Sequence, residues 1–142
     1  MWRVEYEKTF PGLDVEAVWA AWADVERWPE WDKDLESVRL SGPFQAGARF
    51  KLKPKGGPEV DIEILSADPA KGFTDFARFP LARMYDAHEM ARTPQGLTLK
   101  SAIWVEGPLS WVWRKIVAEG VAAGVPAQME ALAEHLRRAA KP

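Results

Sequence analysis

The sequence predicts an α+β fold in which one curved, antiparallel, seven-stranded sheet wraps around a long C-terminal helix. Two patterns predict it. Apolar residues at Val125, Met129, Leu132 and Leu136 are spaced by four, three and four positions, so they share one helical face. Short runs of alternating apolar and polar residues fill positions 35–106 and form the only apolar surface large enough to cover that face.

Composition sets limits on function. The 142 residues predict a single domain, 1–142, and the formal charge of −2 gives no attraction to nucleic acid. Without Cys there is no disulfide, thiolate metal site or cysteine nucleophile. No run approaches the roughly 20 apolar residues of a membrane span, and the N-terminus lacks the layout of a signal peptide. We therefore expect a cytoplasmic protein with no nucleic-acid partner and no membrane span.

The N-terminal part predicts one strand and two short helices. Residues 2–10 alternate between apolar and mostly charged side chains, as in a half-buried strand. Asp14 then stands at the N-cap or in the first turn of a short helix. A second short helical turn stops at Trp28, because the following Pro29 disfavours helical geometry in the residue before it.

Six further strands follow at short spacing, which is typical of an antiparallel meander. Tight turns rich in Pro and Gly separate most of them. The predicted strands lie near residues 35–40, 48–53, 60–64, 73–79, 82–92 and 97–106.

Residues that disfavour a helix interrupt the helical pattern of the final segment. Gly120, Gly124 and Pro126 fall inside it, and a proline in a helix interior costs about 3 kcal/mol or more. We expect a kink or a short break near residues 120–126.

Residues 18–31, VWAAWADVERWPEW, resemble the first-helix signature of the START-like superfamily, in its polyketide cyclase/dehydrase-like branch (SRPBCC). Short motifs at residues 44–47, 88–90 and 107–109 are similar to others of this family. The resemblance implies the helix-grip fold and a deep cavity between sheet and final helix. Relatives include polyketide aromatases and cyclases, lipid and quinone carriers, plant hormone binders and activators of chaperone ATPases, so fold alone does not choose a function.

His88 is the foremost candidate for chemistry. If Met84, Asp86 and His88 point inward, period two places an acid and an imidazole together on the cavity face. We expect the next hairpin to set Leu99 opposite His88 and Ser101 opposite Asp86. Such a cluster can hold a ligand carbonyl or move a proton. The alternative is a structural histidine that satisfies a neighbouring group, or a slipped register that turns the set to solvent.

The strand at 73–79 has two possible inward faces. If Thr74, Phe76 and Arg78 point inward, Arg78 can pair with Asp86 and anchor an anionic or carbonyl group. The other residues of this strand alternate equally well, and an arginine at the rim or surface is the alternative.

Aromatic and acidic residues complete the candidates. Trp28 and Trp31 are placed as a gate over the pocket, or alternatively as a corner that plugs the core. Trp104 shares a face with charged residues and so lies outside, where it is available for a dimer contact. Acidic residues between 24 and 34 surround turns without metal-ligand spacing. We expect no metal and no cofactor.

The predicted function is binding of a small hydrophobic ligand, lipid-, polyketide- or aromatic-like, by a monomer or homodimer. One alternative is a cyclase or dehydratase in which His88 and Asp86 act as general acid and base. A second is a regulatory module that binds a partner protein through its outer surface. The expected ligand-binding residues are Trp28, Trp31, Phe50, Ile62, Phe76, Arg78, Met84, Ser101, Ile103, Val121 and Met129.

Overall fold

The computed structural model describes residues 2–140 and contains the predicted seven-stranded antiparallel sheet. Its strand order is β1-β7-β6-β5-β4-β3-β2, so β2 to β7 form a meander and β1 pairs with the last strand. The strands are β1 (Arg3–Phe10), β2 (Leu35–Leu40), β3 (Arg49–Pro54), β4 (Val60–Asp68), β5 (Gly72–Phe79), β6 (Ala82–Thr93) and β7 (Gly96–Glu106).

Two short helices follow β1, as predicted. In α1 (Val15–Ala23), Asp14 is the N-cap, and its carboxylate accepts a hydrogen bond from the backbone N–H of Ala17 at 3.1 Å. The 3₁₀ helix η1 (Val25–Glu30) carries Trp28, whose indole N–H donates to two carbonyl oxygens of α1. These bonds fix η1 against α1.

The C-terminal segment is helical from Ser110 to Ala139, in three consecutive pieces. They are α2 (Ser110–Trp113), the π-helical turn η2 (Arg114–Ala118) and α3 (Glu119–Ala139). A kink or a short break was expected near residues 120–126; the break is absent, because α3 continues through Pro126 and the irregular turn η2 lies upstream. A proline removes one backbone donor. A helix of 21 residues packed on a sheet keeps its other hydrogen bonds.

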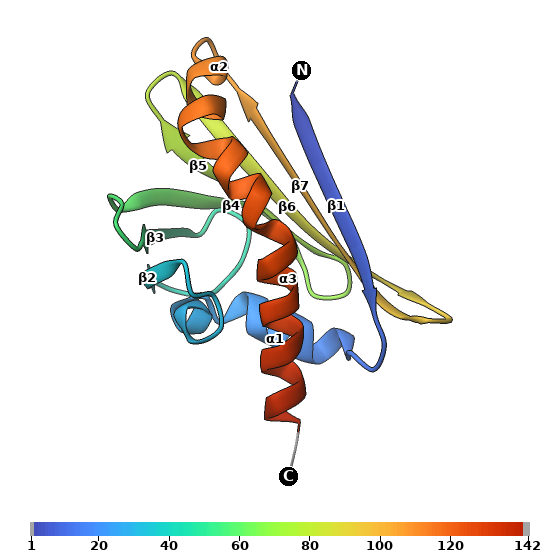
Figure 1. The fold of residues 1–142 in the computed structure, drawn as a ribbon. Coiled ribbons are helices and arrows are strands. Elements are labelled where there is room, and N and C mark those ends of the chain that lie inside the picture. Colours follow the sequence, from blue (N-terminus) through green and yellow to red (C-terminus); the bar gives the residue numbers. More distant parts are fainter. Residues whose placement is uncertain (1, 141–142) are drawn as a thin grey trace.

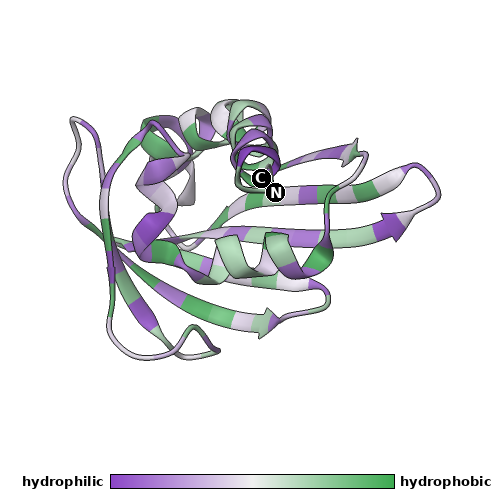
Figure 2. Cartoon of the chain, turned by 90° about the horizontal axis from the view of Figure 1, so that it is seen from below, coloured by the Kyte–Doolittle hydropathy of each residue, from purple (hydrophilic) through white to green (hydrophobic). Residues whose placement is uncertain are grey.

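Figure 1 shows α3 lying across the sheet, with α2 at one end of the molecule and α1 at the other. The predicted stripe packs inward: Val125, Met129 and Leu132 are buried, and Leu136 is partly buried against the core. In Figure 2 the sheet curves below the C-terminal helix, and hydropathy changes repeatedly along its strands. None of the helices described is long and apolar enough to cross a membrane.

The β6–β7 register differs from the expected one by two residues. His88 lies opposite Ser101, Asp86 lies opposite Ile103, and Leu99 pairs with Met90. The reason is the turn, in which Thr93 pairs with Gly96 and leaves only two residues in the loop. A shift of two preserves the face of each side chain, so Asp86, His88 and Ser101 still share the cavity side.

Candidate functional site

A cavity of about 260 Å³ lies between the concave face of the sheet and α3. This volume is just below the range of about 300–1,000 Å³ typical of small-molecule sites, which favours a compact ligand. The residues that line it come from α1, η1 and the segment after it, from strands β2 to β7, and from the C-terminal helix.

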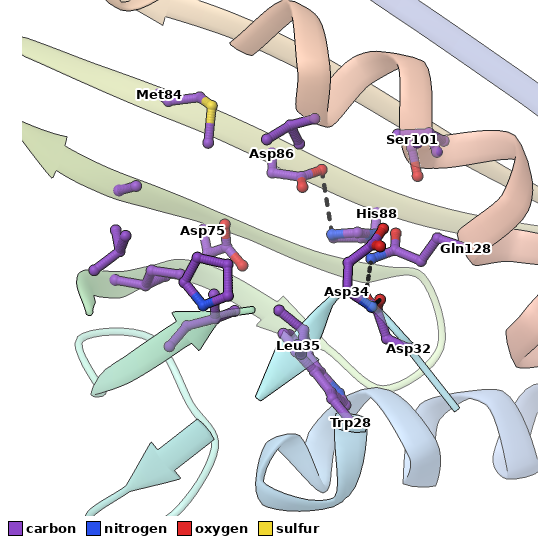
Figure 3. Close-up of a pocket in the computed structure, with 18 of the residues that line it drawn as sticks. Trp28, Asp32, Asp34, Leu35, Asp75, Met84, Asp86, His88, Ser101 and Gln128 are labelled. Atoms are coloured by element: carbon purple, nitrogen blue, oxygen red, sulfur yellow. Dashed lines mark hydrogen bonds and ion pairs between the residues drawn. The ribbon is translucent and has the colours of Figure 1, made fainter. Parts of the chain in front are cut away.

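The sheet supplies the first of two clusters of polar side chains in the cavity. Asp75 on β5 is directly opposite Asp86 on β6, and His88 on β6 is directly opposite Ser101 on β7. Residues opposite each other in an antiparallel sheet share a face, with Cβ atoms roughly 4.5–5.5 Å apart. Figure 3 shows Asp75, Asp86 and His88 directed toward the same space.

His88 and Asp86 form an ion pair. Nε2 of His88 lies 3.2 Å from Oδ1 of Asp86, although that buried oxygen has no well-aligned hydrogen bond among the described residues. The imidazole also stacks on Phe73, with ring centroids 4.5 Å apart, and lies beside Trp22. These two rings hold the imidazole in place and exclude water from one side.

The surroundings shift the pKa values of two of these groups. Burial raises the pKa of Asp75 well above its ordinary value, the charge of Asp86 raises it further, and His88 opposes the shift. Burial alone would lower the pKa of His88, but the attraction of Asp86 and Asp75 outweighs burial and raises it. Both shifts favour the protonated form of the group concerned.

A second polar group lies across the cavity, between the segment before β2 and α3. The buried carboxylate of Asp32 accepts a hydrogen bond from Gln128 at 2.9 Å and another from the backbone N–H of Asp34 at 3.0 Å. Asp32 thus makes the turn predicted for it and also links that turn to α3 (Figure 3).

Aromatic side chains form much of the remaining wall. Trp28 is 8% exposed and contacts Trp31 and Phe50, with ring centroids at 6.4 and 5.7 Å. Both tryptophans line the cavity, with Trp22, Phe73 and Phe79. The wall therefore presents flat aromatic faces as well as aliphatic groups.

Most of the residues expected at the site surround this cavity. The structure places these nine in its lining: Trp28, Trp31, Ile62, Met84, Asp86, His88, Ser101, Val121 and Met129. Phe50 and Ile103 are instead fully enclosed in the packed core and do not reach the cavity.

Phe76 and Arg78 lie on the outer face of the sheet, and this corrects the inward assignment. Arg78 forms an ion pair with Glu63 rather than with Asp86, and its guanidinium lies 4.9 Å from the centroid of Phe76. Phe76 also packs on Tyr85, which stacks on Trp104 of the same face. The outward position predicted for Trp104 is confirmed.

Sequence reasoning missed Asp75 because it left the inward face of β5 open. The signal was present in the turn between β5 and β6. Phe79 pairs with Ala82 across Pro80 and Leu81, and counting back from this two-residue turn places Asp75 opposite Asp86. Leu81 has the left-handed φ of 56° that such a tight turn demands.

Among residues 2–140 no group of three or more His, Asp or Glu side chains is arranged to hold a metal ion.

Three large apolar side chains are exposed near the α2 end of the molecule. Leu81, Trp111 and Ile116 are 64%, 68% and 66% exposed. Trp113 of α2 donates a hydrogen bond to the carbonyl of Pro80 at 2.9 Å, which holds α2 on the β5–β6 turn.

Comparisons with known proteins agree with this architecture. A hypothetical protein from Helicobacter pylori superposes with a TM-score of 0.76 at 15% identity, covering 94% of this chain and 86% of the other. Ara h 8.0201 gives 0.74 at 14% identity, covering 96% and 98%. Norcoclaurine synthase from Thalictrum flavum, in complex with dopamine and hydroxybenzaldehyde, gives 0.72 at 14% identity, covering 99% and 88%.

A search of curated protein sequences finds no match. The family model described as "Polyketide cyclase / dehydrase and lipid transport" matches residues 1–139. The helix-grip architecture and this match agree with the resemblance seen in the sequence. The chain belongs to the polyketide cyclase/dehydrase and lipid transport family.

Proposed function

We propose that this protein binds a compact hydrophobic small molecule, with an aromatic or polyketide-like ring system, in the cavity between the sheet and α3. The observation that carries the proposal is the lining itself, which combines aromatic walls with a small set of convergent polar groups. The volume of about 260 Å³ suits one or two rings better than a two-chain lipid.

Native mass spectrometry of the gently purified protein, followed by solvent extraction, tests this function. A reproducible adduct of a small hydrophobic compound is expected. Val121→Trp should weaken the adduct, because Val121 lines the cavity at its exposed edge, where it is 36% exposed, and the larger ring narrows the space. Leu65→Trp is the matched control, since Leu65 is 54% exposed and outside the cavity. Equal adducts in both variants would contradict the proposal.

The second candidate function is catalysis of the cyclase or dehydratase type. The His88–Asp86 pair favours it, because a raised pKa lets the imidazolium donate a proton to a bound carbonyl oxygen and take one back. Turnover of the extracted compound, or of its open-chain precursor, should then fall at least about a hundredfold in His88→Gln. Unchanged turnover in that variant would remove this candidate.

A third candidate, a protein-interaction module, is favoured by the exposed Leu81, Trp111 and Ile116. Size-exclusion chromatography with light scattering tests the simplest case, the homodimer. A dimer in the wild type that becomes a monomer in Trp111→Ser would support it. If the protein is a monomer at all concentrations, the only remaining partner for this surface is a different protein.

A further inference from the structure

The charged side chains that line the cavity are strongly biased in sign. Four of them are acidic, namely Asp32, Asp34, Asp75 and Asp86, and His88 is the only basic one. No Lys or Arg of residues 2–140 contributes to the lining. The whole chain has nearly equal numbers, with 19 basic and 21 acidic side chains, so the bias belongs to the cavity and not to the composition.

Asp75 is the buried member of this set for which the described residues supply neither a hydrogen bond nor an ion pair. It is 7% exposed and lines the cavity, and no hydrogen bond from the described residues stabilises its carboxyl group. A buried carboxyl group without a hydrogen-bond partner is destabilising. A ligand that carries a strong hydrogen-bond donor would supply the missing partner of the Asp75 carboxyl group.

Apart from His88, the residues that line the cavity around Asp75 are acidic or uncharged. From β6 it faces Asp86 and His88, and the segment before β2 contributes Asp32 and Asp34. The lining residues of β4, η2 and α3 carry no charge. His88 is paired with Asp86, and its opposing effect on the pKa of Asp75 is smaller than the effects of burial and of Asp86.

The walls beside Asp75 also suit a cation attached to a ring. Phe73 lies two residues before it on the same face of β5, stacked on His88 and in edge contact with Trp22 at 5.5 Å. Aromatic faces attract cations, and they pack against the flat body of an aromatic ligand.

We infer that the ligand is an aromatic amine, whose ammonium group binds between Asp75 and Asp86 while its ring packs against Trp22, Trp28 and Phe73. This inference rests on the proposed function, since it specifies the ligand class of the same cavity. It also sets a proton balance. The amine enters as R–NH₃⁺, Asp75 changes from COOH to COO⁻ to pair with it, and one proton leaves to solvent.

Isothermal titration calorimetry of the purified protein tests the inference with three probes of equal ring size. They are 2-(naphthalen-2-yl)ethylamine, 2-(naphthalen-2-yl)ethanol and naphthalen-2-ylacetate. The amine should bind about tenfold or more tightly than the alcohol, and the carboxylate most weakly, because a charge-assisted hydrogen bond replaces a neutral one. Titration in phosphate and in Tris buffer should show release of up to one proton for the amine and none for the alcohol.

Two variants isolate Asp75. Asp75→Asn should lower the affinity for the amine to that for the alcohol and should leave the alcohol unchanged. Asp61→Asn is the matched control, because Asp61 is an exposed residue of β4 that pairs with Lys51 outside the cavity. It should change neither affinity.

The probes separate failure of this inference from failure of the proposed function. Equal binding of amine and alcohol, or an amine preference that survives in Asp75→Asn, would overturn the amine inference while leaving a hydrophobic binding site. Absence of binding by all three probes would overturn both. If Asp75→Asn does not fold, the wild-type pH dependence decides: amine affinity should rise with pH as Asp75 loses its proton, and a flat profile would refute the inference.

Discussion

Asp75 and Asp86 are direct cross-strand partners on β5 and β6, and both side chains enter one largely apolar cavity. Two carboxylates this close do not both ionise readily in a buried site. His88 pairs with Asp86, and Asp75 is left as the group whose pKa burial raises well above its ordinary value. Three titratable side chains therefore lie together on two adjacent strands, β5 and β6.

Asp75→Asn should change how stability depends on pH. The unfolded carboxyl loses its proton near pH 4 and the folded one only at much higher pH, so the unfolded state binds fewer protons between these values. Wild-type stability must therefore fall as pH rises through this window, with a slope of up to about 1.4 kcal/mol per pH unit. Urea denaturation between pH 4.5 and 6.5 should show this slope in the wild type and its loss in the variant. Parallel curves for the two proteins would show that Asp75 ionises normally.

Asp86→Asn should reverse the direction of the His88 pKa shift. Burial lowers the pKa of His88 and the nearby carboxyl groups raise it, with Asp86 the largest opposing influence. Without Asp86, desolvation should dominate and bring the pKa below about 6.5. The sequence has only two histidines, so NMR of the imidazole ¹⁵N nuclei can follow both. His135, on α3, is the internal reference, and a rise in the His88 value in the variant would contradict the assignment.

Gly124→Ala should raise the free energy of unfolding and lower the affinity for the ligand. Gly124 lies inside α3, and a Cβ there would come no closer than 4.0 Å to Oδ2 of Asp34. Ala in place of a helical Gly should raise the free energy of unfolding by roughly 0.5–1 kcal/mol. The added methyl group also narrows the cavity, so affinity for a ring-sized ligand should fall.

Gly72→Ala provides the contrasting case, in which a glycine substitution should lower the free energy of unfolding rather than raise it. At Gly72 the φ angle is +139°, and a Cβ would lie 1.9 Å from the carbonyl oxygen of His88. This variant should be strongly destabilised in thermal unfolding. A stable Gly72→Ala protein would argue against the close β5–β6 approach that also aligns Asp75 with Asp86.

Trp28→Ala should be among the most destabilising substitutions. Trp28 packs on Phe50, Phe73 and Trp31 and donates its indole N–H to α1. Loss of a large buried aromatic side chain costs about 3–5 kcal/mol. Trp111→Ala, at a 68% exposed position, should change stability by less than about 0.5 kcal/mol. Chemical denaturation of both variants measures this, and similar values would show that Trp28 acts as a mobile gate rather than as part of the core.

The outer face of the sheet explains why the β5 prediction failed. Phe76 is a large apolar residue, and its 3% exposure looks like that of a cavity or core residue. It is covered on the outside by the guanidinium groups of Arg78 and Arg83, with their carbon atoms 4.9 and 5.0 Å from the ring centroid. Hydrophobicity alone therefore gave β5 two equally apolar faces, and one of them is buried by charged side chains.

Local periodicity determined the order of the elements, the seven strands and the inward stripe of α3, because apolar spacing of 3.6 or 2 residues is a property of each segment by itself. The same reasoning placed Asp86 and His88 together. The period of two left the face of β5 open, since either face satisfies it, and the register set by the two-residue turn to β6 selects one. Tertiary structure alone decided that Phe50 and Ile103 are sealed in the core while Asp75, Asp32 and Gln128 reach the cavity, because the shape of an enclosed space depends on how distant segments pack together.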